Sequence, residues 1–198
     1  MFYSLWGRLL FDPTTPDTIF ASQLSQRYGA ARGPDLLDAW RIASRAPLHI
    51  ASFYQGTSDG TLYSEGFAYS RNRELHLIGI DQFINRPTLV SIADFVKSGR
   101  QVPAGKTSPL KLAVGVEREA EESMRIVQEI RASATVPPTL DCELTDIETW
   151  AWMDRYLAEK LRGGVALATF RATGDAAEKQ RAVSALERRQ PTGGIWRG

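Results

Sequence analysis

The chain has 198 residues, of which 43% are hydrophobic and 24% charged, proportions typical of a globular protein that buries its own core. Its 24 basic and 23 acidic side chains leave a net charge of +1, so charge gives no argument for nucleic acid or a membrane surface as a partner. The single cysteine, Cys142, excludes an intramolecular disulfide and argues against a cysteine-based zinc site.

The two ends of the sequence suggest that it was cut from something longer. Apolar, helix-compatible residues follow Met1 directly, and residues 191–198 form a turn-rich tail that we expect to be flexible. The start is too short for a signal peptide, and the sequence has no long apolar run that would span a membrane. We therefore expect a fragment, cytoplasmic by default.

Residues 1–47 predict a pair of helices after a short apolar opening segment. The first helix is expected over 16–28, because Pro16 suits the first helical position and Gly29 suits the stop. The second begins at 33–35 and ends before Pro47. The short connection between them favours an antiparallel arrangement.

Residues 48–107 show no sustained hydrophobic period and predict a long irregular segment. Within it, 50–54 fits either a short extended stretch or the tail of a helix, and one helical turn is expected at 80–84. A short helix over 91–98 should be closed by Gly99. Because long loops in compact domains are more often functional or partner-covered than idle, we expect ligand contacts in this segment.

Residues 108–190 predict three antiparallel helices. Ser108 caps the first, the second begins after Pro138 and ends at Gly174, and a capping-box pattern at 175–178 opens the third. The whole chain is thus predicted as a single, mainly α domain, an antiparallel bundle-like arrangement with a long irregular central segment. The predicted inward-facing residues of the three helices are Ala113, Val116, Ala120, Met124, Val127 and Ile130; Leu140, Leu144, Ile147, Ala151, Ala158, Leu161, Val165, Ala168 and Ala172; and Ala182, Val183 and Leu186.

The usual motifs of catalysis and cofactor binding are missing from the sequence. His49 and His76 are far apart and lie in no metal-binding pattern, so we expect ordinary core or surface histidines and no metal site. The sequence contains no glycine-rich phosphate loop and no nucleophile-elbow string. We therefore predict no cofactor.

Acidic side chains in the irregular segment offer one route to chemistry. Asp59, Glu65, Glu74 and Asp81 all lie there, and two suitably placed carboxyl groups suffice for glycoside hydrolysis. Neither their spacing nor an apolar setting forces a raised pKa on any of them. Solvated loop acids are therefore the more common interpretation.

Asp154 falls on the apolar stripe of the second C-terminal helix, so we expect it to point inward. A buried aspartate must be paired or hydrogen-bonded, and we expect a structural partner such as Arg8, Arg125 or Arg131. Arg8 is in turn predicted to pair with an acid such as Asp12 or Asp154. These groups are assigned structural roles.

The opening string LWGRLLFDP at residues 5–13, followed by an acid-capped helix and RYG at 27–29, resembles a junction in α-glucuronidase-like glycoside hydrolases and related uncharacterised bacterial proteins. In those proteins this segment closes the catalytic (β/α)₈ barrel and leads into a helical C-terminal region. The resemblance continues in SIADF at 91–95, SPL at 108–110, AEKLRG at 158–163 and FRATGD at 170–175.

The resemblance implies a helical region whose catalytic barrel is absent, since these residues show no eightfold strand–helix alternation. No catalytic residue is therefore carried over. The resemblance does imply that Asp59, Tyr63 and Glu65 border a sugar site built mainly by another segment. It also implies a parent protein that acts on carbohydrate.

We therefore expect a non-catalytic accessory region, inactive alone, that docks a catalytic barrel on Trp6, Leu9, Leu10 and Phe11 and contacts carbohydrate. A self-sufficient helical binding or scaffold module is the first alternative, and it predicts that this apolar face is covered within the chain. The second alternative is an independent glycosidase that uses the loop carboxylates, which must then lie about 5 to 10 Å apart.

Overall fold

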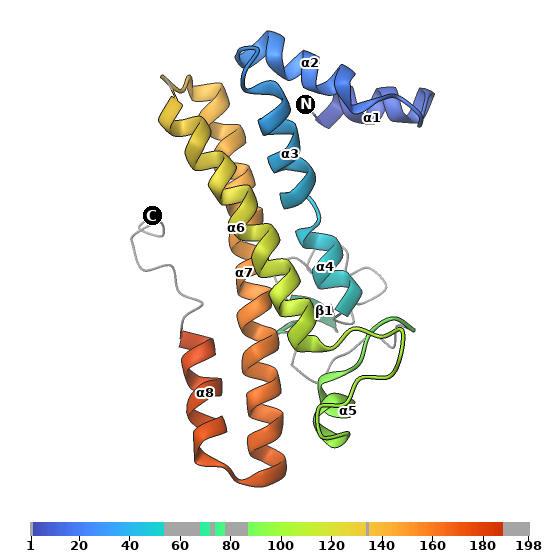
Figure 1. Cartoon of the computed structure of the whole chain (residues 1–198), viewed down its shortest axis with the longest axis vertical. Coiled ribbons are helices and arrows are strands. Elements are labelled where there is room, and N and C mark those ends of the chain that lie inside the picture. The colour runs from blue at the N-terminus through green and yellow to red at the C-terminus, as the bar shows by residue number, and fades with distance from the viewer. Residues whose placement is uncertain (1, 54–67, 72–73, 78–86, 134, 188–198) are drawn as a thin grey trace. The chain divides into compact units, whose positions relative to one another are not determined.

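The computed structural model is mainly α-helical with bundle-like packing, which confirms the predicted fold class (Figure 1). It describes residues 2–53, 68–71, 74–77, 87–133 and 135–187. The helices in these ranges are α1 Phe2–Phe11, α2 Asp17–Tyr28, α3 Gly33–Ala43, α4 Ala46–Phe53, α5 Ile92–Lys97, α6 Pro109–Ser133, α7 Pro138–Thr173 and α8 Ala176–Glu187.

The chain divides into two compact units, and the long helices α6 and α7 contribute residues to both. Unit 1 consists of Met1–Ser44 and Glu119–Ala151, and unit 2 of Arg45–Arg118 and Trp152–Gly198. Each unit has its own apolar core. None of the described helices has the length and apolar character needed to cross a membrane.

Unit 1 is built on the predicted pair α2 and α3, which pack against each other (Figure 1). The pair appears within a residue or two of the expected positions, although α2 begins at Asp17 and Pro16 stands just before it. The buried core of this unit comprises Phe20, Leu24, Tyr28, Leu36, Leu37, Ala39, Ala43, Ile126, Val127, Ile130, Leu140, Leu144 and Ile147.

Gly33 permits the close approach of α3 to α2. A Cβ atom at this position would lie 2.1 Å from Ser25 Oγ and 2.4 Å from the carbonyl oxygen of Ala21. The hydroxyl can rotate away, but the backbone oxygen cannot move without shifting α2.

Replacing Gly33 by alanine is therefore expected to destabilise the protein by about 2 kcal/mol. Gly115 in α6 is the matched control, because a Cβ there meets nothing within 4 Å. Gly115→Ala should leave stability unchanged or raise it by up to about 1 kcal/mol. Urea unfolding measures the free energy of unfolding of the two variants. Equal values would show that α3 does not approach α2 closely at Gly33.

The region after α3 differs from the prediction, because a separate helix, α4, follows it. Pro47 does not mark the end of helical structure but occupies the second position of α4, where its missing N–H costs nothing. Residues 50–53 are accordingly the tail of a helix, one of the two structures expected for that stretch.

Unit 2 contains α4, α5, α8 and the remaining parts of α6 and α7. The predicted Ser108 cap is present, since Ser108 Oγ accepts from Lys111 N at 3.1 Å, and Ser91 caps α5 by accepting from Asp94 N at 3.0 Å. The buried core of this unit comprises Ile50, Phe53, Leu89, Val90, Ile92, Phe95, Ala113, Val116, Leu157, Ala158, Leu161 and Val165.

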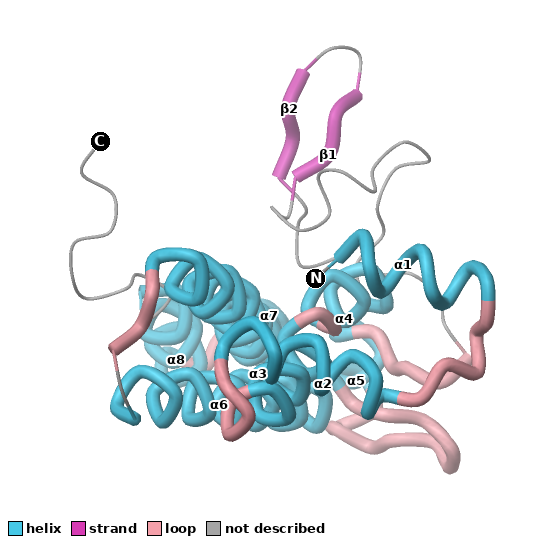
Figure 2. Tube along the Cα trace, turned by 90° about the horizontal axis from the view of Figure 1, so that it is seen from above, coloured by secondary structure: helices cyan, strands magenta, loops and turns pink. Residues whose placement is uncertain are grey.

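The central segment contains an antiparallel hairpin that the sequence analysis missed (Figure 2). Its strands are β1 Ala68–Arg71 and β2 Glu74–Leu77, with Ala68 opposite Leu77 and Arg71 opposite Glu74. Strands of four residues are too short to display a recognisable alternation of apolar and polar side chains. The helical turn expected at 80–84 and the tail at 191–198 lie outside the described residues.

The inward-facing residues predicted for α6 and α7 are largely confirmed, since most of them are buried, although Met124 and Ala168 are only half-buried and Ala172 is exposed. In α8 the prediction was wrong for Val183, which is 38% exposed. The buried face of α8 instead contains Glu178, Ala182 and Ala185, spaced at i, i+4 and i+7. An acid thus occupies a position that an apolar pattern would not reveal.

Candidate functional site

The predicted sugar-site residues Asp59, Tyr63 and Glu65 lie outside the described residues. Their proximity to one another, and the role implied by the resemblance, stay predictions. Among the residues that the structure does describe, no three His, Cys, Asp or Glu side chains gather as they would around a metal ion.

Asp12 stabilises the turn that follows α1. Its Oδ1 accepts hydrogen bonds from the amide and hydroxyl of Thr14, at 2.9 and 2.6 Å, and these bonds hold the pKa of Asp12 below its usual value. Arg8 is exposed, and its carbonyl oxygen accepts from the Asp12 amide at 2.7 Å. The Asp12 side chain thus binds Thr14, whereas the expected ion pair with the Arg8 side chain is replaced by a backbone contact.

Asp154 is 1% exposed, in agreement with the inward position predicted for it. Its Oδ1 lies 3.0 Å from His49 Nδ1, and the His49 side chain is 19% exposed. A carboxylate at Nδ1 fixes the imidazole ring and favours the tautomer that carries a proton on that nitrogen. The pair ties α4 to α7 inside unit 2.

A histidine, rather than one of the three arginines considered, is thus found beside Asp154. Arg125 pairs instead with Glu122 and Glu129, and Arg131 pairs with Asp141 and Glu148. His49 and Asp154 are 105 residues apart, so no local spacing signals the contact.

The His49–Asp154 pair resembles the orienting half of a catalytic triad, but the neighbouring hydroxyl does not complete one. Ser52 Oγ donates to the backbone carbonyl of His49 at 2.8 Å, as a helical serine commonly does near its own turn. A nucleophile would instead need its oxygen within reach of the imidazole ring. Ser52 therefore does not complete a triad, and what the pair visibly does is join α4 to α7.

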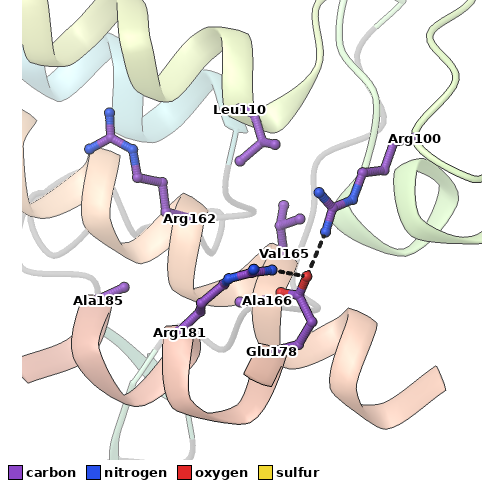
Figure 3. Close-up of a pocket in the computed structure, with 8 residues that line it drawn as sticks. All are labelled: Arg100, Leu110, Arg162, Val165, Ala166, Glu178, Arg181 and Ala185. Carbon is purple, nitrogen blue, oxygen red and sulfur yellow. Dashed lines mark hydrogen bonds and ion pairs between the residues drawn. The ribbon is translucent and has the colours of Figure 1, made fainter. Parts of the chain in front are cut away.

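Unit 2 also contains a pocket of about 220 Å³ among α6, α7, α8 and the loop after α5 (Figure 3). Its wall is part apolar and part charged, with three guanidinium groups and one carboxylate. The lining residues are Arg100, Leu110, Arg162, Val165, Ala166, Glu178, Arg181 and Ala185.

Glu178 is the electrostatic centre of this pocket. Its side chain is 8% exposed, and its Oε1 accepts from Arg100 at 3.1 Å and from Arg181 at 2.6 Å (Figure 3). The predicted capping box assigned Glu178 to the N-cap backbone, but the Asp175 amide donates to Thr173 Oγ1 instead. Asp175 itself acts as predicted, since its Oδ1 accepts from Ala177 N at 2.8 Å.

Arg100 reaches Glu178 from an unusual backbone conformation. Its φ of +69° follows Gly99 at +66°, and the Arg100 amide donates to the carbonyl oxygen of Phe95 at 2.8 Å. The left-handed region costs a residue with a Cβ about 1 to 2 kcal/mol. The charge-assisted hydrogen bond to a buried carboxylate offsets this cost.

Arg162 forms a second charged cluster at the same pocket. It binds both oxygens of Glu117 and donates to Glu159 Oε1 at 2.8 Å. The hydrogen bonds to Glu117 are the main cause of a raised pKa for Arg162, and burial opposes them. The guanidinium therefore stays charged, with its side chain 28% exposed.

No family model matches the chain, and no match is found among the curated proteins or the solved structures. The resemblance to α-glucuronidase-like glycoside hydrolases accordingly rests on the quoted residues alone.

Proposed function

We propose that this chain is a non-catalytic helical accessory module of a carbohydrate-active, glycoside-hydrolase-like protein, and that α1 docks against the catalytic barrel. The observation that carries the proposal is the exposure of two adjacent large apolar side chains at the end of α1. Leu10 is 73% exposed and Phe11 is 93% exposed.

The neighbouring residue explains how α1 can present these side chains while remaining attached to unit 1. Leu9 is partly buried and packs against the apolar core of that unit. Successive residues of a helix point about 100° apart, so a helix anchored by Leu9 directs its neighbours elsewhere. Burying Leu10 and Phe11 in a partner would contribute about 1.5 to 3 kcal/mol for each side chain.

The choice of a barrel as the partner rests on the position of these residues. Leu10 and Phe11 belong to the string at 5–13 that resembles the segment between a catalytic barrel and its helical region. A self-sufficient module predicts that the face formed by Trp6, Leu9, Leu10 and Phe11 is covered within the chain. Leu9 is partly covered, and the Trp6 side chain lies outside what the structure describes. The exposure of Leu10 and Phe11 favours docking over that alternative. Contacts with carbohydrate through Asp59, Tyr63 and Glu65 remain part of the proposal.

An activity assay separates this proposal from the independent-glycosidase alternative. The chain alone should not hydrolyse aryl glycosides, because its proposed role is to bind a domain that carries the catalytic carboxylates. Turnover by the chain that Asp59→Asn or Glu65→Gln abolishes would replace the proposal with the glycosidase.

A further inference from the structure

We propose that the pocket lined by Arg100, Arg162 and Arg181 in unit 2 binds a small organic monocarboxylate. The guanidinium groups of Arg100 and Arg181 hold the carboxylate, and the apolar part of the wall takes a short carbon chain. This binding site is separate from the docking role proposed for α1, and either can fail without the other.

The arginines at the pocket already show that its geometry suits a carboxylate. Arg100 and Arg181 converge on one oxygen of Glu178 from two different elements (Figure 3). A guanidinium carries five N–H donors in a planar fork, so both groups can bind a second oxyanion while they hold Glu178. Their side chains are 46% and 67% exposed, which leaves them accessible to a ligand from solution.

The charge of the pocket favours a monoanion over a phosphate. The positive charges of Arg100, Arg162 and Arg181 are matched by three carboxylates, those of Glu178, Glu117 and Glu159. A carboxylate adds a single negative charge to this neutral group, whereas a phosphate monoester adds about 1.5 to 2 near pH 7. Because the group is already neutral, a ligand with one negative charge is opposed less than a ligand with nearly two.

The apolar part of the pocket indicates the size of the ligand. Leu110, Val165, Ala166 and Ala185 line it, and its volume is about 220 Å³. That volume equals about seven water molecules at about 30 Å³ each, which suits a carboxylate with roughly four to six carbons. Each further methylene buried against these side chains should tighten binding about fourfold, so hexanoate should bind more tightly than acetate.

Titration with sodium hexanoate, followed by the amide chemical shifts of the folded protein, tests the proposal. We expect saturable shifts in α8 and in the loop after α5. Arg181→Gln and Arg100→Asn should each weaken binding about tenfold, because each removes one charge-assisted contact. Asparagine tolerates the left-handed conformation at position 100, and glutamine at 181 keeps an N–H donor for the buried Glu178 carboxylate; circular dichroism of both variants checks that they are folded.

The controls make each outcome decisive. Arg125→Gln removes an exposed, paired arginine from unit 1 and should bind hexanoate like the unmodified protein. Hexanamide, which has the same chain without the charge, should bind at least about tenfold more weakly. The proposal fails if no saturable shift appears up to about 50 mM, a range that covers weak ligand binding. Equal binding by hexanamide, tighter binding of inorganic phosphate, or unchanged affinity in Arg181→Gln would each overturn it as well.

Discussion

Replacing Asp154 by alanine should destabilise the protein by about 3 kcal/mol, more than any other exchange of a single polar side chain considered above. The carboxylate is 1% exposed and lies 3.0 Å from His49 Nδ1. Alanine removes that hydrogen bond and leaves a partly buried imidazole nitrogen beside a small cavity. Asparagine keeps the volume and one acceptor oxygen, so Asp154→Asn should cost less, about 1 to 2 kcal/mol.

Urea unfolding followed by circular dichroism measures these differences. Asp146 is the matched control, because it lies on the same helix but is exposed. Asp146→Ala should change the free energy of unfolding by no more than about 0.5 kcal/mol. A similar small loss for Asp154→Ala would mean that the pair with His49 does not stabilise the fold.

Local physics explains why so much of the helical structure could be predicted. Ser108 precedes α6, and its hydroxyl accepts the amide of Lys111 three residues on, a contact fixed by short-range geometry. The stripes of α6 and α7 follow from the helical repeat, which places residues three and four apart on one face. Caps and stripes depend only on neighbours in sequence, so a sequence can reveal them.

The contacts that define the candidate sites depend instead on residues far apart in sequence. Arg100 and Glu178 are 78 residues apart, and neither belongs to a motif that would announce the other. The local sequence around Glu178 fits a capping box equally well, and it therefore predicts a contact with the helix N-terminus. In the structure the Glu178 carboxylate instead binds Arg100, which is distant in sequence. One signal did exist, since Glu178, Ala182 and Ala185 share a helical face that an acid would rarely occupy without a partner.

If α1 docks a catalytic barrel as proposed, replacing both Leu10 and Phe11 by serine should weaken that binding by at least about 100-fold, which corresponds to about 2.7 kcal/mol. Two exposed apolar side chains that become buried together supply an effect of this size. The variant should fold normally, because these side chains are 73% and 93% exposed and Leu9 keeps α1 on the core. Leu48→Ser in α4 is the control, since Leu48 is 68% exposed but lies outside the proposed docking face.

The most direct test of the proposed accessory role is calorimetric titration of this chain into a purified (β/α)₈ catalytic barrel of an α-glucuronidase-like glycoside hydrolase. The proposal predicts saturable one-to-one binding that Leu10→Ser/Phe11→Ser weakens at least about 100-fold and Leu48→Ser leaves unchanged. Absence of binding, or equal affinity for the unmodified chain and the Leu10→Ser/Phe11→Ser variant, would contradict docking through α1.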